Sequence, residues 1–140
     1  MKIFIGADHR GFELKEYLKK ELAGYEIVDC GNSVLDNDDD YPDYGTLVGK
    51  SVVENGTLGI VICGSGVGIS IGANKVNGVR CALCWREDVA KQAREHLDAN
   101  VISIPSDFVT FDEALALAKT FLETKFTGEE RHVRRICKLK

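Results

Sequence analysis

The sequence predicts an α/β protein: a doubly wound, Rossmann-like sheet of five parallel strands with flanking helices and a C-terminal helix. Two observations support this class. Short apolar segments alternate five times with longer segments in which apolar residues recur at helical spacing. The apolar segments also lack polar residues at alternate positions, which is typical of strands covered on both faces. Right-handed crossovers between such strands place helices on both sides of the sheet.

The five strands are expected at residues 2–6, 25–28, 60–62, 79–84 and 101–104. Helical spacing predicts helices over 12–22, from Leu47 to Gly56, over 67–77 and over 86–97. Thr110 and Glu113 have the spacing of a capping box and should begin the next helix. A last helix is expected over about 129–138. Residues 30–43 are polar, include an acidic run and are expected to form a loop closed by Tyr41 to Tyr44.

Length and composition limit the possible functions. A chain of 140 residues corresponds to one domain, residues 1–140, and 44% hydrophobic content is ordinary for a soluble globular protein. The net charge of −4 argues against a nucleic-acid partner. We expect no membrane association and no signal peptide, because no apolar run is long enough. Five cysteines without framework spacing favour a reducing, cytoplasmic location.

The turn after the third strand is the strongest candidate for a functional site. Cys63 ends the apolar run, and Gly64, Gly66 and Gly68 follow before a helix. Glycines let a ligand approach the backbone, and the first amides of a helix can bind an anion and stabilise a thiolate. A purely structural role for a buried cysteine and a packed turn is the alternative. The spacing fits neither a dinucleotide-binding fingerprint nor a phosphate-binding P-loop.

Other reactive side chains also fall near predicted strand ends. Asp8 and His9 follow the first strand, whereas His96 and Asn100 precede the fifth and should lie at the opposite edge unless a second subunit contributes them. Each has a structural alternative. Asp8 can cap a helix, His96 can interact with a helix dipole, and His132 with its neighbouring arginines can be a solvated face. Together these groups suit proton abstraction next to a sugar carbonyl.

The pair Cys81 and Cys84 formally matches a C-x-x-C pattern. It falls in a predicted strand, where residues three apart face opposite sides of the sheet. We therefore expect neither a metal nor a redox function for this pair.

Several segments, in order and over nearly the whole chain, resemble the type B ribose-5-phosphate isomerase family. They are Gly6 to Gly11, Tyr41 to Tyr44, Ile62 to Ser70, Ala73 to Lys75, His96 to Asn100, and Arg131 to Arg135. The resemblance implies interconversion of ribose 5-phosphate and ribulose 5-phosphate without metal or organic cofactor. It also implies a homodimer or tetramer whose active sites are shared between subunits, with a small-molecule phosphosugar as partner.

The resemblance also implies roles for individual residues. Cys63 is expected to be the base, with Ser65 moving protons on the oxygens and His96 and Asp8 assisting ring opening. Amides of the turn would hold the enediolate oxygen. The expected substrate-binding residues are His9, Tyr41, Gly64, Gly66, Val67, Gly68, Asn74, Asn100, Arg131 and Arg135.

One position departs from the family pattern. After the fifth strand the family usually has an arginine that reaches the phosphate, and this chain has Asp107. Either phosphate binding shifts to the C-terminal arginines, with Arg10 as a further compensating cation, or the substrate is another phosphosugar or a free sugar. Galactose 6-phosphate, allose 6-phosphate and a tetrose phosphate are the alternatives. A non-catalytic phosphosugar sensor is a further one, and it would bind without exchanging the C2 proton.

Overall fold

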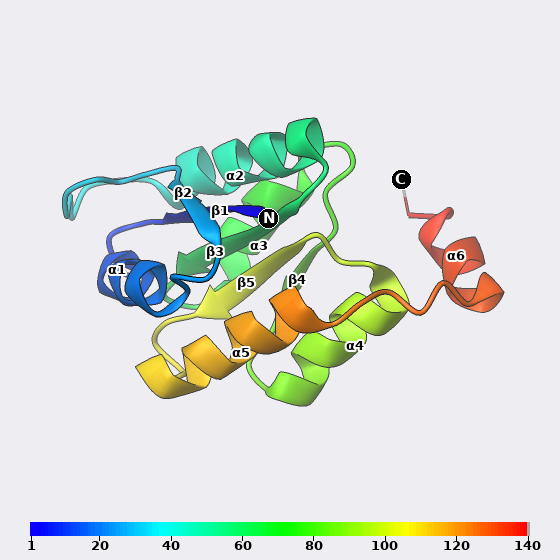
Figure 1. Cartoon of the computed structure of the whole chain (residues 1–140). Helices are drawn as coiled ribbons and strands as arrows, with labels where there is room; N and C mark the ends of the chain where they lie inside the picture. Colours follow the sequence, from blue (N-terminus) through cyan, green and yellow to red (C-terminus); the bar gives the residue numbers. More distant parts are fainter. Residues whose placement is uncertain (140) are drawn as a thin grey trace.

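A computed structural model of the chain describes residues 1–139 and confirms the predicted fold class. Five parallel strands form one sheet, and helices cover both of its faces (Figure 1). The strands are β1 (Lys2–Ala7), β2 (Glu26–Asp29), β3 (Leu58–Cys63), β4 (Cys81–Leu83) and β5 (Val101–Pro105). The helices are α1 (Phe12–Glu21), α2 (Tyr41–Asn55), α3 (Val67–Asn74), α4 (Glu87–Leu97), α5 (Phe111–Glu123) and α6 (Glu130–Ile136).

The strand order places a topological switch point between β1 and β3. The order across the sheet is β2-β1-β3-β5-β4. β2 therefore lies on one side of β1, and β3, the next strand in the sequence, lies on its other side. Ligands of such sheets bind outside the carboxyl ends of the strands at this point. Those ends are the turns that begin at Asp8 and Gly64.

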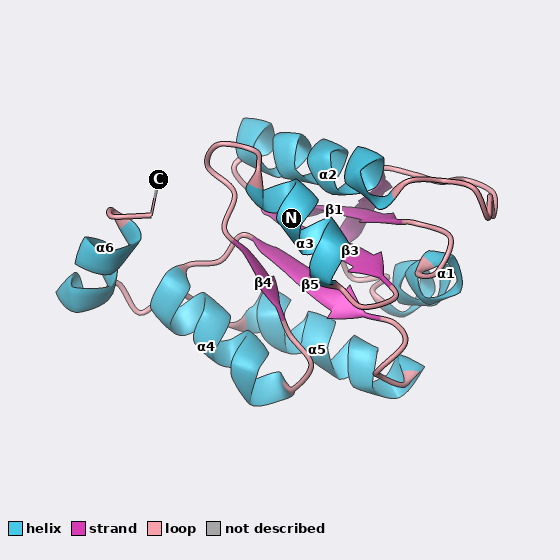
Figure 2. Cartoon of the chain, turned by 180° about the vertical axis from the view of Figure 1, so that it is seen from behind, coloured by secondary structure: helices cyan, strands magenta, loops and turns pink. Residues whose placement is uncertain are grey.

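Side chains from the two faces of the sheet form two separate hydrophobic clusters. Ile60 and Ile62 of β3 pack on the face covered by α1, α4 and α5. Val61 and Cys63, which alternate with them, pack on the face covered by α2 and α3 (Figure 2). Burial on both faces explains why the strands are continuous apolar runs. The alternation also directs Cys63 toward the first turn of α3.

The predicted boundaries of α2, α3 and β4 are wrong by one to six residues. α2 begins at Tyr41 rather than near Leu47, because Pro42 lies in its first turn, where the missing amide costs nothing. α3 ends at Asn74 rather than at residue 77, and β4 is limited to Cys81–Leu83. The predicted end of α2 at Gly56 is confirmed, and this C-cap glycine is left-handed, with φ 58°.

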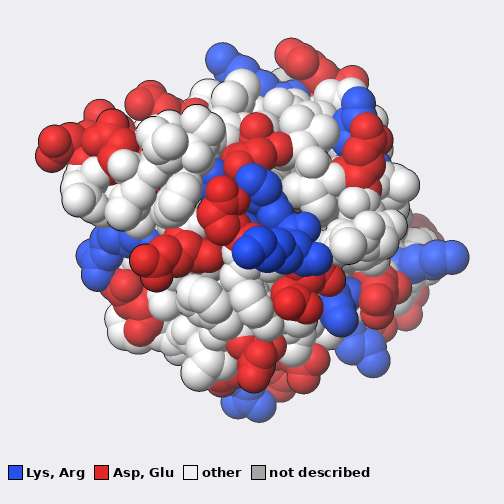
Figure 3. Space-filling model, turned by 60° about the vertical axis from the view of Figure 1, so that its left-hand side comes forward, with Lys and Arg blue, Asp and Glu red and all other residues white. Residues whose placement is uncertain are grey.

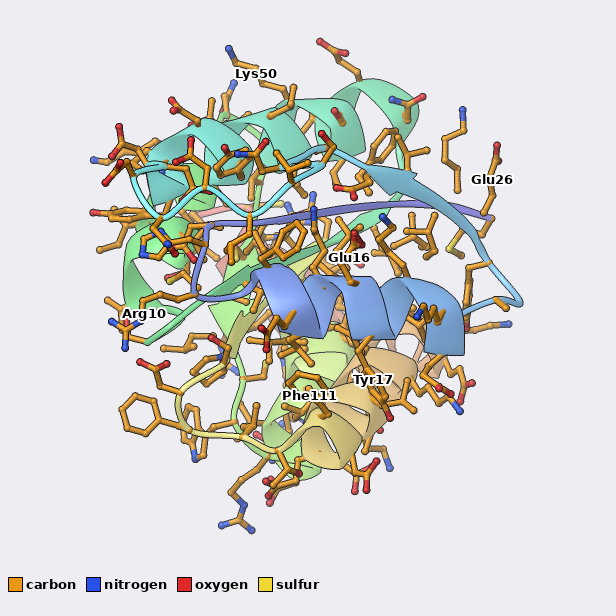
Figure 4. All side chains as sticks on the ribbon, turned by 90° about the vertical axis from the view of Figure 1, so that its left-hand side faces the viewer. Arg10, Glu16, Tyr17, Glu26, Lys50 and Phe111 are labelled. Atoms are coloured by element: carbon orange, nitrogen blue, oxygen red, sulfur yellow. The ribbon has the colours of Figure 1, made fainter. Side chains whose placement is uncertain are left out.

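The capping box at Thr110 is confirmed and orients α5. The Thr110 hydroxyl accepts from the amide of Glu113, and the Glu113 carboxylate accepts from the amide of Thr110. Phe111, the first residue of α5, packs against Tyr17 of α1 with ring centroids 5.0 Å apart (Figure 4). This contact fixes α5 beside α1 near the carboxyl ends of the strands.

A buried lysine fixes the start of the long β2–α2 loop. Lys15 of α1 is fully buried, and its ammonium group lies 3.0 Å from both carboxylate oxygens of Asp29 and also donates to the carbonyl of Asn32. Burying a charge is costly in free energy unless it is paired. The contacts of Lys15 with Asp29 and Asn32 therefore hold the start of the loop against α1. The loop then runs on to the acidic segment.

The surface is mixed in charge. Figure 3 shows basic and acidic side chains interleaved on the face turned toward the viewer, in keeping with a net charge of only −4. Within residues 1–139, no helix combines the length and hydropathy that a bilayer-crossing segment needs.

Candidate active site

The turn from β3 into α3 is held in a conformation that requires glycine. Gly66 has φ 72°, in the left-handed region, and a Cβ built there would lie 2.5 Å from Cδ1 of Leu83. The buried Ser103 hydroxyl donates to the Gly66 carbonyl at 2.6 Å and pins the turn to β5. Cys63 is 4% exposed at the start of this turn. The Ser65 hydroxyl accepts from the amide of Val67 at 3.1 Å.

Tyr41 covers the first turn of α3. A Cβ built on Gly68 would lie 2.7 Å from Cε1 of Tyr41, so the ring is in direct contact with this glycine. The amide of Gly68 belongs to the first helical turn, where amides have no partner within the helix. Tyr41 therefore forms a wall beside the amides that the sequence suggests as an anion-binding group.

Asp8 lies beside Cys63 at the end of the neighbouring strand. Its amide donates to the Ile62 carbonyl at 3.3 Å, and its carboxylate accepts from the amides of Arg10 and Gly11 at 3.0 and 3.2 Å. The alternative role of Asp8 as the helix cap is wrong, because Gly11 is the N-cap residue of α1 and no side chain caps this helix. Burial raises the pKa of Asp8, and the two amide hydrogen bonds oppose that effect.

His9 is bound by a residue of the acidic loop. Asp39 Oδ1 accepts from the His9 amide at 2.9 Å and lies 2.8 Å from Nδ1 of the ring. The hydrogen bond to Asp39 is the main reason that the pKa of His9 is raised. The imidazole therefore keeps its positive charge to a higher pH than a free histidine, which favours contact with an anion.

Asp107 forms an ion pair with Arg10 directly above the candidate turn. A Cβ built on Gly64 would lie 2.7 Å from Nε of Arg10 and 2.8 Å from Oδ2 of Asp107. Ser106 also donates to the Cys63 carbonyl at 3.2 Å, so the β5–α5 turn lies against this backbone. In Figure 4, Arg10 projects from the turn before α1 at the edge of the molecule. The negative charge of Asp107 is thus matched by Arg10, the residue that the sequence suggested as a compensating cation.

Asn74 and Asn100 lie at the amino ends of strands, away from Cys63. The Asn74 side chain bonds both the amide and the carbonyl of Cys81, at 2.8 and 3.0 Å. The Asn100 side chain accepts from the amide of Arg80 at 2.8 Å and donates to the Gly78 carbonyl at 2.9 Å. Each amide therefore retains only part of its hydrogen-bonding capacity for a ligand.

His96 is half-buried in the last turn of α4 and stacks on His132 of α6, with ring centroids 4.4 Å apart. His132 is 6% exposed, so the proposed solvated face is wrong for this residue, and its burial lowers its pKa. Arg131 and Arg135 are exposed. In Figure 1, α6 lies beyond the amino end of β5, at the opposite end of the sheet from the Cys63 turn.

One chain therefore divides the predicted site residues into two groups. Val101 pairs with Gly59 and Pro105 with Cys63, so Asn100 and Cys63 are separated by the length of β3. At about 3.3 Å per residue this distance exceeds the reach of a small sugar phosphate. The switch-point group is Asp8, His9, Tyr41, Cys63, Gly64, Ser65, Gly66, Val67 and Gly68. The amino-end group is Asn74, His96, Asn100, Arg131 and Arg135.

Two groups of side chains in the structure are of the types that bind metals in proteins. Cys81 and Cys84 contact opposite hydrophobic clusters, as predicted, and burial raises the pKa of Cys84 to about 12. Asp8, His9 and Asp39 place potential metal-binding atoms within 4.8 Å of one another. In this group, however, Nδ1 of His9 is already hydrogen-bonded to Asp39.

A thiol, a carboxyl group and an imidazole at the switch point of a parallel sheet define an α/β protein equipped for acid–base chemistry on an anionic ligand. Comparison with known protein families identifies a more specific class. Residues 3–139 match the family model described as Ribose/Galactose Isomerase. The chain therefore belongs to the ribose/galactose isomerase family.

The similarity to individual relatives extends over nearly the whole chain. The chain is 45% identical over 139 residues to ribose-5-phosphate isomerase B of Mycobacterium tuberculosis, covering 97% of this chain and 86% of that protein. The solved structure of the Thermotoga maritima ribose 5-phosphate isomerase superposes with a TM-score of 0.94 at 42% identity, covering 99% and 96% of the two chains. The Mycoplasma genitalium ribose-5-phosphate isomerase B, solved with bound ribulose-5-phosphate, gives 0.94 at 44% identity, covering 99% and 93%.

We expect Gly66→Ala to destabilise the protein by about 2–3 kcal/mol, because it adds a steric clash to the cost of a left-handed alanine. Gly56→Ala is the matched control. Its φ is also positive, at 58°, but nothing lies within 4 Å of the added methyl. The control should therefore lose only about 1 kcal/mol. Urea unfolding followed by circular dichroism measures both, and equal losses would show that Leu83 does not constrain the turn.

Proposed function

We propose that this protein interconverts ribose 5-phosphate and ribulose 5-phosphate. The main structural observation that supports this proposal is the Cys63–Gly68 turn at the switch point, with Asp8 and His9 beside it. Membership of the ribose/galactose isomerase family supports the proposal, as do relatives named ribose-5-phosphate isomerase B. The Mycoplasma genitalium relative is described with ribulose-5-phosphate bound, which supports this substrate over the alternatives.

In the proposed reaction, the Cys63 thiolate removes the proton from C2 of the open-chain aldose. The electron pair forms a C1–C2 double bond, and the carbonyl oxygen becomes the enediolate oxygen held by amides of Gly64 to Gly68. The same thiol then delivers the proton to C1, while Ser65 transfers a proton between the two oxygens. Atoms and charge balance without a cofactor or metal. Each fixed amide contributes about 10²–10³ to such a rate.

The amino-end group completes the site only if a second copy supplies it. We propose a homodimer, alone or within a tetramer, in which His96, Asn100, Arg131 and Arg135 of one copy face Cys63 of the other. His96 and the neighbour's Asp8 would then open the furanose ring. The arginines and His9 would bind the phosphate, since guanidinium groups suit its oxygens. The separation of the two groups within one chain supports this arrangement.

Asp107 does not oppose a phosphosugar in this proposal. Its carboxylate is paired with Arg10, so the pair adds little net charge near the turn. Phosphate recognition then rests on the histidine and the C-terminal arginines. Five free cysteines support the proposed reducing, cytoplasmic location.

A substrate panel tests the reaction itself. Turnover should be highest with ribose 5-phosphate and at least tenfold lower with allose 6-phosphate, galactose 6-phosphate and unphosphorylated ribose. Ribose lacks the phosphate group that the site would bind, and the two hexose phosphates place that group one carbon farther from C1 and C2. When the reaction runs in deuterated water, the product ribulose 5-phosphate should carry deuterium on C1, the carbon that receives the proton. Binding of ribose 5-phosphate without exchange would indicate a sensor, and preference for another sugar would indicate the alternative isomerase.

Replacing the proposed base should remove chemistry while sparing binding. We expect Cys63→Ala to lower kcat by about 10²–10⁴-fold with KM changed little, because the base acts in the transition state. Cys137→Ala removes an exposed thiol and is the control, with normal kinetics expected. Steady-state assays of both variants measure the effect. A Cys63→Ala enzyme with wild-type turnover would assign proton transfer to another residue.

Mixed assemblies test whether sites are shared. Cys63→Ala and His96→Ala should each be nearly inactive alone. After unfolding and refolding together in equal amounts, the mixture should regain about a quarter of wild-type activity, because half of the dimers then contain one intact site. An isomerase assay measures the regained activity, and size-exclusion chromatography with light scattering measures the number of subunits in the assembly. A mixture that stays inactive although mixed dimers form would mean that Cys63 and His96 act within one chain.

A further inference from the structure

The acidic segment between β2 and α2 contains one residue that differs from its neighbours in burial and contacts. Asp36 and Asp38 are exposed, whereas the side chain of Asp39 is only 4% exposed. The turn that presents it is built locally. Asp36 accepts from the amide of Asp39 through its backbone carbonyl and from the amide of Asp38 through its carboxylate, at 3.2 and 3.0 Å.

We infer that Asp39 is a positioning residue that holds His9 in one orientation and one tautomer for contact with the phosphate group of the substrate. This inference rests on the proposed function. The side chain of Asp39 is almost fully buried, whereas that of His9 is partly exposed, so Asp39 acts through His9. The acidic loop, which adds negative charge near a proposed anion site, thereby contributes to anion binding.

The hydrogen bonds fix both the backbone and the ring of His9. One oxygen, Oδ1 of Asp39, is 2.9 Å from the His9 amide and 2.8 Å from Nδ1. A carboxylate oxygen only accepts, so Nδ1 must carry the proton in this contact. Nε2 is then the free ring nitrogen, and the imidazole remains 30% exposed. When the ring is protonated, Nε2–H is the donor available to a phosphate oxygen.

The carboxylates around the ring favour its protonated form. Asp39 and Asp8 favour the imidazolium form of His9, Arg10 and partial burial oppose it, and the net effect is a raised pKa. Phosphate binding through His9 should therefore persist above pH 6.5 and weaken as the pH rises through the higher value. Without Asp39 the same loss should begin at lower pH.

The second carboxylate oxygen of Asp39, Oδ2, is in an energetically unfavourable environment. Within residues 1–139, Oδ2 is buried and has no hydrogen-bond partner. Burial raises the pKa of Tyr44, and the neighbouring carboxylates of Asp39, Asp36 and Asp43 raise it further. A buried carboxylate with an unpaired oxygen calls for an explanation, and a role in orienting His9 supplies one. A hollow of about 330 Å³ lined by His9, Leu35 and Asn37 lies next to this pair.

The test compares Asp39→Asn with Asp38→Asn, which removes the same charge from the adjacent exposed position. Both full-length variants are treated with EDTA and titrated by NMR. The chain has only three histidines, so His9→Asn assigns the His9 signals. Asp39→Asn should lower the pKa of His9 toward its ordinary value and weaken the binding of inorganic phosphate at neutral pH by about tenfold. It should raise KM for ribose 5-phosphate similarly, with kcat nearly unchanged, and the control should match wild type.

A measurement on the wild-type protein covers the case in which Asp39→Asn does not fold. Long-range ¹H–¹⁵N correlation above the His9 titration should show the proton on Nδ1. A proton on Nε2 there, or an unchanged His9 titration in folded Asp39→Asn, would overturn the inference. If wild type lacks isomerase activity but His9 shows the expected tautomer and phosphate response, the proposed function fails while the hold of Asp39 on His9 stands.

Discussion

The close packing of the β1–α1 turn against the end of β3 is the constraint on which the candidate site depends. Ala7 pairs with Ile62, and the Ile62 carbonyl accepts from the next amide along β1. A Cβ on Gly11 would lie only 2.6 Å from the side chain of Ile62, so the turn can approach β3 only with glycine there. This approach brings the Asp8 carboxyl group beside the cysteine. A register shift of one residue would turn Cys63 to the other face of the sheet.

Features that depend on local sequence were predictable. The strands are continuous apolar runs, and Thr110 and Glu113 satisfy each other's neighbouring backbone groups without help from the rest of the fold. The glycine turn after Cys63 was predictable for the same reason. Its left-handed residue, Gly66, needs a backbone conformation that glycine adopts most easily. The start of α2 was not predicted, because Pro42 was interpreted as the end of a loop, although proline is equally suited to the first turn of a helix.

Features that depend on distant contacts were not predictable. Nothing in the acidic run distinguishes Asp39 from its neighbours, since its partner His9 lies 30 residues earlier. Arg10 and Asp107 are 97 residues apart, and only the fold shows that they form a pair. The burial of His132 likewise depends on the stacking of α6 on α4. The position of β4 at the sheet edge also departs from the order of the strands in the sequence.

The side chain of Asn74 substitutes for a sixth strand. In a parallel ladder, alternate residues of an edge strand direct both backbone groups outward, and these groups invite pairing with another molecule. On β4 one such residue is Cys81, whose amide and carbonyl are both bonded by the carboxamide of Asn74. A primary amide has the same donor and acceptor as a peptide group, so it ends the ladder as another backbone would. A strand of another molecule could therefore pair with Cys81 at this edge only by displacing the Asn74 side chain.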